Sequence, residues 1–511
     1  MTVDRLNELL LACTLVLLVA VAAVRLTSRI GLPTLLLYLG IGMIIGQDGL
    51  GVDFQDAELT QVFGYAALVV ILAEGGLSTR WRLIKPALPA AAVLATVGVG
   101  VSVGVTAAAA HYLVGLEWQT ALVMGAVVSS TDAAAVFSVL RKVPLPSRLS
   151  GALEAESGFN DAPVVILVVA FSTLDALDQP AQHWLLLPGA MLLQLAIGLA
   201  IGLAVGRLGA FGLRHVALPA SGLYPIAVLA LTVLAYAAAA MVNGSGFLAV
   251  YVAALVLGNA RLPHRPATRG FADAMAWVAQ MGLFILLGLL VNPSELLDDF
   301  WPAIAIGLGL TLVARPLSVA LSLLPFRRPW QEHVLMSWAG LRGAVPIVLA
   351  TIPVVNGVAE SDRVFNIVFL LVVVFTLLQG PTLPWVARRL HLGQDERTVD
   401  VDIESAPLER LRGHLLSVTI PRDSRMHGVE VAELRLPRAA AVTLVVRDGT
   451  SFVPDPTTVL MRGDELLVVA TDPVRDEVEQ RLHAVAEGGK LARWLRETGA
   501  TGIRRNRRPG E

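Results

Sequence analysis

Apolar segments of about 14 to 27 residues fill the first 390 positions of the chain and alternate with short polar loops. A helix needs about 20 mainly apolar residues to cross the hydrocarbon core of a bilayer. The pattern therefore predicts thirteen membrane spans, near 9–27, 33–46, 60–77, 86–112, 119–140, 154–174, 184–208, 221–242, 245–259, 271–291, 301–324, 332–353 and 364–387.

The charges of the loops provide a test that does not depend on hydropathy. When the loops are taken alternately, one side of the predicted membrane holds seventeen Lys and Arg residues, and the other holds only Arg5 and Arg363. Cytoplasmic loops carry an excess of Lys and Arg. The alternation predicts an N-terminus outside the cytoplasm and a cytoplasmic C-terminus. Because Arg25 and Arg29 follow the first apolar segment, we expect that segment to be retained as a span.

The composition agrees with lipid as the solvent for most of the chain. Of its 511 residues, 55% are hydrophobic and 16% are charged, and the mean hydropathy is +0.68. A typical soluble domain has about 25% charged residues. The formal net charge of -2 gives no indication of a nucleic-acid partner. The single cysteine, Cys13, excludes an intramolecular disulfide and a Cys-rich metal site.

After residue 390 the sequence takes on the composition of a soluble protein. Residues 391–414 are polar and charged, which predicts a linker. Residues 415–488 contain alternating apolar segments such as "LLSVTIP" and "DELLVVA", followed by the helical pattern "DPVRDEVEQRLHAVAE". We predict a small cytoplasmic α+β domain there. The basic stretch 489–511 is predicted to be a disordered tail.

Three predicted spans contain polar groups that are costly in lipid. They carry "SSTDAAAVF" (129–137), "ESGFND" (156–161) and "SWAGLRGAVPIVL" (337–349). A charged side chain at the centre of a membrane costs about 2.5–3.5 kcal/mol on insertion scales, so such residues are functional candidates by default. Irregular backbone is tolerated at this depth only where it lines a cavity or is buried in protein. We therefore expect broken helices in the fifth and twelfth spans.

Asp161 is the strongest candidate for ion chemistry. Its carboxylate can release a proton and then hold a cation, or do the reverse, and competition for one group couples the two ions. Asn160 beside it cannot ionise and contributes only hydrogen bonds. If Asp161 alone alternates between a proton and a monovalent cation, the exchange is one for one and electrically silent. The alternative is a buried carboxyl that is hydrogen-bonded for packing.

Asp132 and Arg342 are the charges of the two predicted breaks. Ser129, Ser130 and Thr131 offer hydroxyl oxygens next to Asp132. Arg342 needs an anionic partner, and the sequence leaves two open: Glu156, or the carbonyl end of a broken helix.

Two further charges near span ends have ordinary interpretations. Arg315 could either extend to the cytoplasmic surface or form a buried pair. Glu74 is expected to pair with Arg80 or Arg82.

The two predicted breaks lie seven spans apart. This spacing is that of two inverted repeats of six spans separated by one linking span, with the site near the midplane where the breaks cross. The sequence therefore predicts an all-α polytopic membrane protein with crossed broken helices and a small cytoplasmic α+β domain.

With these motifs, the chain resembles the monovalent cation/proton antiporters of the cation:proton antiporter superfamily, NhaP type. The most specific motifs are "SSTDAAAVF", "ESGFND" and "GLRGAVPIVLA". The resemblance implies a bacterial inner-membrane homodimer, elevator-type alternating access and electroneutral exchange. It also implies the roles of the site residues: ion and proton binding by Asp161, Asp132, Thr131 and Ser157, with the monovalent cation at Asp161 and Asp132, and bracing by Asn160, Glu156 and Arg342, the last paired with Glu156.

Two features point to the potassium/proton branch of these antiporters. Ala133 follows the fifth-span aspartate, where many sodium-selective members have proline. The soluble segment resembles a TrkA-C (RCK C-terminal) domain, and the analogy suggests a small-molecule effector. No strand-linked G-x-G-x-x-G precedes that segment, so a nucleotide-binding half is not expected.

The sequence thus predicts an antiporter that exchanges protons for K⁺ or Na⁺ and is not an enzyme, with no cofactor and no nucleic-acid partner. An RCK-gated channel is the first alternative, but the chain has no filter-like "TVGYG". An intramembrane aspartyl protease using Asp132 and Asp161 is the second, and it would be expected to show a "GxGD" motif.

Overall fold

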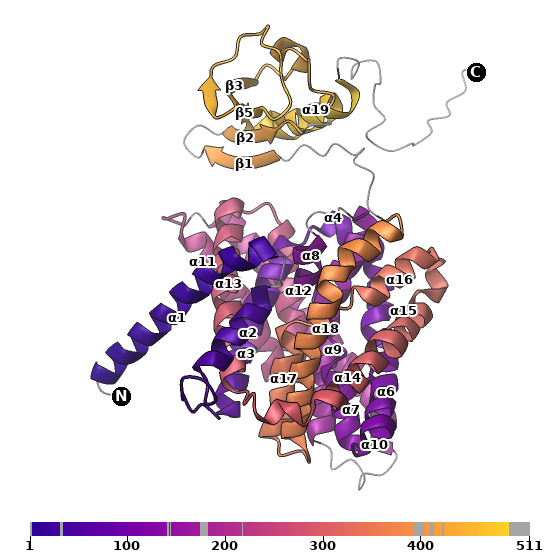
Figure 1. The fold of residues 1–511 in the computed structure, drawn as a ribbon. Coiled ribbons are helices and arrows are strands. Elements are labelled where there is room, and N and C mark those ends of the chain that lie inside the picture. The colour runs from indigo at the N-terminus through magenta and orange to yellow at the C-terminus, as the bar shows by residue number, and fades with distance from the viewer. Residues whose placement is uncertain are drawn as a thin grey trace, which may run out of the picture. The chain divides into compact units, whose positions relative to one another are not determined.

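The structure, a computed structural model, describes residues 3–30, 34–140, 143, 145–173, 182–216, 218–392, 403–408, 413–421 and 424–489. The chain divides into two compact units, Met1–Gly393 and Gln394–Glu511. The first unit is helical throughout the part described, and the second contains a sheet (Figure 1). The predicted basic tail beyond Gly489 lies outside the described residues.

The first unit is a bundle of apolar helices (Figure 1). Its α-helices are α1 (Val3–Ile30), α2 (Thr34–Ile45), α3 (Ala57–Ser78), α4 (Trp81–Ile84), α5 (Leu88–Val93), α6 (Val99–Ala109), α7 (Trp118–Val127), α8 (Ala133–Leu140), α9 (Ser147–Thr173), α10 (Gln182–His215), α11 (Leu223–Met241), α12 (Gly246–Asn259), α13 (Arg265–Leu289), α14 (Phe300–Gly309), α15 (Arg315–Leu323), α16 (Trp330–Trp338), α17 (Ala344–Val355) and α18 (Ser361–Arg389). Short π-helical segments join α5 to α6 and α14 to α15 without interrupting the helical path.

The apolar stretches predicted from sequence coincide with these helices. Eight helical stretches among the described residues are long and apolar enough to cross a membrane, including the composite stretches Trp81–Val114 and Phe300–Phe326. Five apolar helices are shorter: Cys13–Val24, Thr34–Ile45, Trp118–Val127, Gly246–Asn259 and Ala344–Val355. Two of these five, α7 and α17, are halves of broken helices.

The two predicted breaks are present and meet each other. The helical path stops between α7 and α8, at residues 128–132, and again between α16 and α17, at residues 339–343. The backbone N–H of Asp132 in the first break donates to the carbonyl of Leu341 in the second, over 2.8 Å. Backbone N–H and C=O groups that have no partner within a helix thus form hydrogen bonds with the opposite break. Such bonds allow irregular backbone deep in a helix bundle.

The second unit contains one antiparallel sheet in the order β1-β2-β5-β3-β4. Its strands are β1 (Ile403–Leu408), β2 (Gly413–Thr419), β3 (Ala440–Arg447), β4 (Thr450–Phe452) and β5 (Glu465–Thr471), and its helix is α19 (Arg475–Gly488). Leu416, Val468 and Leu482 belong to its buried core. The sheet and the following helix agree with the predicted α+β domain.

The prediction of a linker over 391–414 is wrong for residues 403–408. These residues form β1 and pair antiparallel with β2, with Ile403 opposite Val418 and Leu408 opposite Gly413. The polar and charged composition of the segment concealed the strand, because an edge strand is only half covered and tolerates polar residues.

Candidate functional site

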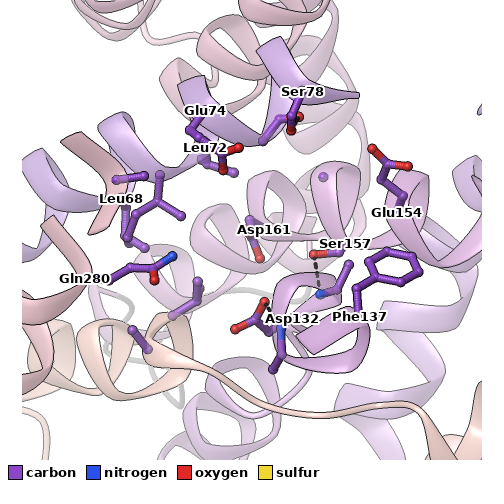
Figure 2. A pocket seen from close by; sticks show the side chains of 18 of the residues that line it. Leu68, Leu72, Glu74, Ser78, Asp132, Phe137, Glu154, Ser157, Asp161 and Gln280 are labelled. Atoms are coloured by element: carbon purple, nitrogen blue, oxygen red, sulfur yellow. Dashed lines mark hydrogen bonds between the residues drawn. The ribbon is translucent and has the colours of Figure 1, made fainter. Parts of the chain in front are cut away.

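A cavity of about 760 Å³ lies beside the crossed breaks (Figure 2). Its wall is formed by residues of α2, α3, α8, α9, α12, α13 and α17 and by the residues that precede α8. All four residues predicted to bind the ion line this cavity: Thr131, Asp132, Ser157 and Asp161. The fold therefore places Asp132 and Asp161, which are nearly 30 positions apart in the sequence, at the same cavity.

Asp161 is held on α9, which stays continuous through this region. Its side chain is only 6% exposed, and Ser130 donates its hydroxyl to Asp161 Oδ1 over 2.6 Å. The other carboxylate oxygen makes no hydrogen bond among the described residues, and Figure 2 shows the side chain near the middle of the cavity. Asp132 lies close enough to repel it electrostatically. A positive ion, either a proton or a cation, relieves that repulsion.

Two further hydrogen bonds connect α9 to the first break. Asn160 Nδ2 donates to Thr131 Oγ1 over 2.6 Å, and the backbone N–H of Ala133 donates to Ser157 Oγ over 3.1 Å. Asn160 thus braces the break with an amide that carries no charge. Ser130, named in the sequence only as one of several hydroxyls, is the direct partner of Asp161.

Asp132 lies at the beginnings of two half-helices. Its Oδ1 accepts from the backbone N–H of Ala135 over 3.2 Å, which caps α8. Its Oδ2 lies against Gly343, directly before α17, where an added Cβ would come within 2.0 Å of that oxygen. Helix N-termini favour negative charge, so the two half-helices stabilise the Asp132 carboxylate. Glycine is needed at position 343 because any larger residue would displace the Asp132 carboxylate.

Arg342 occupies the complementary position at the ends of the other two half-helices. Its Nε donates to the carbonyl of Val128, just past α7, over 3.3 Å, and its Nη1 donates to the carbonyl of Gly340, past α16. Helix C-termini carry partial negative charge. Of the two partners left open by the sequence, the carbonyl ends of the broken helices are the ones observed.

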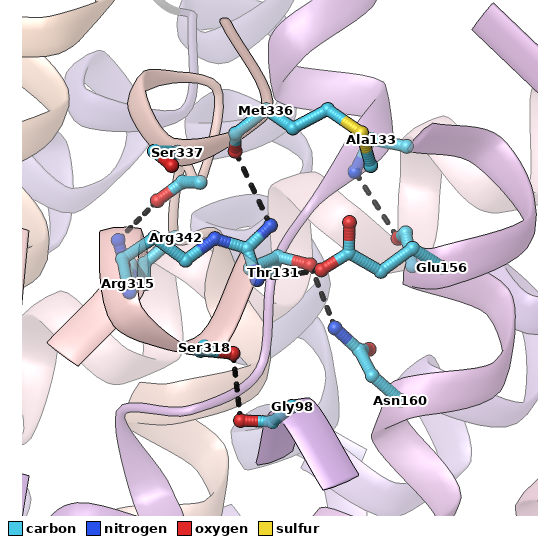
Figure 3. Close-up of polar contacts among 12 residues, drawn as sticks. Gly98, Thr131, Ala133, Glu156, Asn160, Arg315, Ser318, Met336, Ser337 and Arg342 are labelled. Carbon is cyan, nitrogen blue, oxygen red and sulfur yellow. Dashed lines mark hydrogen bonds and ion pairs between the residues drawn. The ribbon is translucent and has the colours of Figure 1, made fainter. Parts of the chain in front are cut away.

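The predicted pairing of Arg342 with Glu156 is therefore wrong. Glu156 pairs with Arg315, whose Nη1 lies 2.6 Å from Glu156 Oε1, and both side chains are no more than 5% exposed (Figure 3). Arg315 stands at the start of α15, after the π-helical segment, so its side chain extends into the bundle rather than to the surface. Of the two interpretations of Arg315, the buried pair is correct.

Other acidic residues also border the cavity. Glu74 lines it from α3, and among the described residues it forms no ion pair with Arg80 or Arg82, contrary to expectation. Glu154 and Asp273 line it from α9 and α13. Glu154 was not among the residues predicted from the sequence, although it precedes Asp161 by seven positions and so shares its helix face.

The site offers oxygen atoms of carboxylate and hydroxyl groups, the ligand type that hard cations prefer. In the part of the chain that the structure describes, no three His, Cys, Asp or Glu side chains are grouped closely enough to hold a metal ion. A carboxylate with one hydroxyl partner and an open oxygen can exchange a proton for a hard monovalent cation.

Comparison with known proteins agrees with this geometry. The family model described as "Sodium/hydrogen exchanger, transmembrane" matches residues 15–389. The chain belongs to the sodium/hydrogen exchanger family. A second match, to the TrkA-C domain, covers residues 415–483, so the soluble unit contains a TrkA-C domain as the resemblance implied. Membership of this family supports cation/proton antiport as the general activity of the chain.

The matches to relatives and to solved structures cover most of this chain. The K(+)/H(+) antiporter NhaP of Alkalimonas amylolytica is 38% identical over 91% of this chain and 82% of its own length. The K(+)/H(+) antiporter NhaP2 of Shewanella oneidensis is 34% identical over 97% and 87%. The sodium proton antiporter MjNhaP1 of Methanocaldococcus jannaschii shares the fold, with a TM-score of 0.66 and 22% identity over 76% of this chain and 100% of that structure.

Proposed function

We propose that this exchanger moves one proton against one K⁺ per cycle, with Asp161 carrying the two ions alternately. The observation that carries the proposal is the buried Asp161 carboxylate, which has one hydroxyl partner and an open oxygen in the cavity. Asn160, its neighbour, is neutral and already committed to Thr131. With a single carboxylate alternating between two monovalent ions, the cycle moves no net charge.

The choice of K⁺ over Na⁺ rests on two supports. Two relatives that cover most of this chain are named K(+)/H(+) antiporters, whereas a relative named a Na(+)/H(+) antiporter, from Aphanothece halophytica, is 29% identical over 75% of this chain. In addition, Ala133 follows Asp132 and donates its backbone N–H to Ser157, a hydrogen bond that proline could not make.

The proposed site set consists of Asp161, Asp132, Thr131 and Ser157 around the cation, with Ser130 added as the hydroxyl partner of Asp161. Asn160 and Arg342 hold the two breaks in place, and Glu156 acts through Arg315. Each of these assignments rests on the hydrogen bonds and the cavity described above.

The proposed architecture has thirteen spans in two inverted repeats, comprising the eight long helices and the five shorter apolar ones. The N-terminus lies outside the cytoplasm and the TrkA-C domain inside, in a bacterial inner membrane. Residues 1–390 form the exchanger, which works by an elevator-type movement as a homodimer. The domain at 415–488 regulates it, in response to a small-molecule effector.

The test is exchange in proteoliposomes that hold an inward-acid pH gradient. K⁺, Na⁺ or Li⁺ is added outside, and a pH-sensitive dye reports the gradient while valinomycin or an uncoupler varies the membrane potential. We expect K⁺ to collapse the gradient most efficiently, at a rate that does not depend on the potential. Asp161→Asn, which keeps the volume but removes the ionisable group, should abolish the exchange while the protein stays folded.

Different failures would exclude different parts of the proposal. Full exchange by Asp161→Asn would refute the role of Asp161. A rate that follows the potential would refute one-for-one stoichiometry. No response to any cation, also after removal of the residues beyond Leu390, would favour the channel or protease alternatives.

A further inference from the structure

One face of α9 runs along the wall of the cavity. Ser150, Glu154, Ser157, Gly158 and Asp161 all line it and recur at the three- and four-residue spacing of a single helix face. Glu154 and Asp161 are seven residues apart, which places them about 10 Å apart along the helix axis. Two carboxyl groups therefore border the same space two turns apart.

The Glu154 carboxyl group has a partner that suits both of its protonation states. Thr79 Oγ1 lies 2.5 Å from Glu154 Oε1 and 2.7 Å from the carbonyl of Gly75. The hydroxyl has one proton, so it can donate to only one of these acceptors at full strength. An ionised Glu154 can accept that proton. A protonated Glu154 can instead donate to Thr79 while the hydroxyl turns to Gly75.

Thr79 is held in place by other contacts. Asn259 Nδ2 donates to the Thr79 carbonyl over 2.9 Å, and Asn259 Oδ1 accepts from the backbone N–H of Trp81 over 2.9 Å. The Thr79 residue is 1% exposed. Glu154 can therefore gain or lose a proton with no movement of heavy atoms.

A second polar group is directed into the same space. The Tyr251 hydroxyl has no partner within ideal hydrogen-bond geometry among the described residues and lies near the Thr79 hydroxyl, although the residue is 2% exposed and lines the cavity. It stands close to Gly158, between the levels of Glu154 and Asp161, and a Cβ on Gly158 would come within 2.6 Å of the Tyr251 oxygen. Glycine at 158 thus leaves the hydroxyl room beside the path between the two carboxyl groups.

The charges around Glu154 come from several elements. Glu74 of α3, Arg80 of the connection to α4 and Tyr251 of α12 interact with Glu154 electrostatically, and Asp273 of α13 interacts with Glu74. Arg82 and Lys85, on the segments that pack against the start of α9, are exposed. Acidic and basic groups from neighbouring elements thus face this carboxyl group together.

We propose that Glu154 is a proton-relay residue, which passes protons between the mouth of the cavity and Asp161 along this face of α9. The inference rests on the proposed function and extends it. A proton taken up from outside the cavity neutralises Glu154. It then moves through cavity water, and past the Tyr251 hydroxyl, to the Asp161 carboxylate as the cation leaves. Glu154 is left ionised and is protonated again from outside.

The test separates proton transfer from cation transfer. In proteoliposomes containing the full chain, proton-coupled exchange is measured as collapse of a pH gradient, and cation exchange as uptake of labelled K⁺ against unlabelled K⁺, which requires no proton. We expect Glu154→Gln to lower proton-coupled exchange at saturating K⁺ at least about tenfold. Labelled K⁺ exchange and the half-saturating K⁺ concentration should stay as in the wild type.

Conservative variants distinguish a relay from a structural role. Thr79→Val should reproduce part of the defect and Thr79→Ser should restore the rate, because serine keeps the hydroxyl. Glu58→Gln removes an exposed acid from the first turn of α3 and serves as the matched control, with no change expected. Equal losses of proton-coupled and labelled K⁺ exchange in Glu154→Gln, or no loss of either, would overturn the relay.

The proposed function fails separately from the relay. If Asp161→Asn keeps full proton-coupled exchange, the proposed function is refuted whatever Glu154 does. If Asp161→Asn is inactive and Glu154→Gln matches the wild type at every pH, only the relay is refuted.

Discussion

Replacement of Arg315 by methionine should destabilise the exchanger strongly. The change removes the guanidinium that lies 2.6 Å from Glu156 and leaves that carboxylate without its direct ion-pair partner, at a side-chain exposure of 3%. Removal of one partner of a buried ion pair costs about 3–5 kcal/mol, because the remaining charge stays out of water. Replacement of both partners by apolar residues of similar size costs far less. The double variant Arg315→Met with Glu156→Leu should therefore be more stable than Arg315→Met alone.

The assay is unfolding in mixed micelles of mild detergent and sodium dodecyl sulfate, followed by circular dichroism. The free energy of unfolding of Arg315→Met should be lower than that of the wild type by about 3–5 kcal/mol. Glu360→Gln is the control, because its pair with Arg363 is about 40% exposed and contributes about 0–1 kcal/mol. A loss in Arg315→Met no larger than in the control would refute the buried pair. A double variant less stable than both single variants would refute the assumption that the loss of stability in Arg315→Met comes from the unpaired Glu156 carboxylate.

Two further predictions concern the crossed breaks and the TrkA-C domain. Gly343→Ala should lower the exchange rate about a hundredfold, because the added Cβ displaces Asp132. Gly270→Ala is the control, because Gly270 has open space around it. An unchanged rate in Gly343→Ala would contradict the placement of Asp132. Asp464→Asn should lower the stability of the TrkA-C domain by about 1–3 kcal/mol, because it removes the negative charge and replaces one of the two carboxylate oxygens that accept hydrogen bonds of 2.8 and 2.7 Å from Arg447. Calorimetry of the full chain would show the shift, and an unchanged transition would refute the contribution.

The positions of the helices and of the breaks could be predicted from the sequence because their signals are local. Apolar length defines a span, and Asp132 or Arg342 next to small residues marks an interruption. The cost of a charge in lipid is large enough that such residues have few structural alternatives. For the same reason Asp161 could be proposed as the principal carboxylate from one stretch of sequence.

The choice between partners could not be predicted, because it depends on how neighbouring helices are rotated. Arg342 was the predicted partner of Glu156, but Arg315 also lies in apolar sequence far along the chain from Glu156. Once residues 339–343 leave the helix, two carbonyls at half-helix ends accept hydrogen bonds from Nε and Nη1 of Arg342, and Arg315 is the guanidinium that pairs with Glu156.

Hydroxyl assignments were limited in a similar way. Ser130 and Thr131 are adjacent, and an irregular backbone directs them to different partners, Asp161 and Asn160. No periodicity applies to such a segment, so the sequence could name the oxygens but not the contacts. Glu154 was different, since the seven-residue spacing to Asp161 was present in the sequence and marked a shared helix face.

The most direct test of the central claim, that a proton and a cation compete for Asp161, is proton release on cation binding. K⁺ is added to the purified exchanger in weakly buffered detergent solution, and a pH-sensitive dye is read across the pH range in which exchange occurs. We predict that each bound K⁺ releases up to one proton, and that Asp161→Asn releases none. Binding of K⁺ without proton release, or equal release from Asp161→Asn, would contradict competition at this carboxylate.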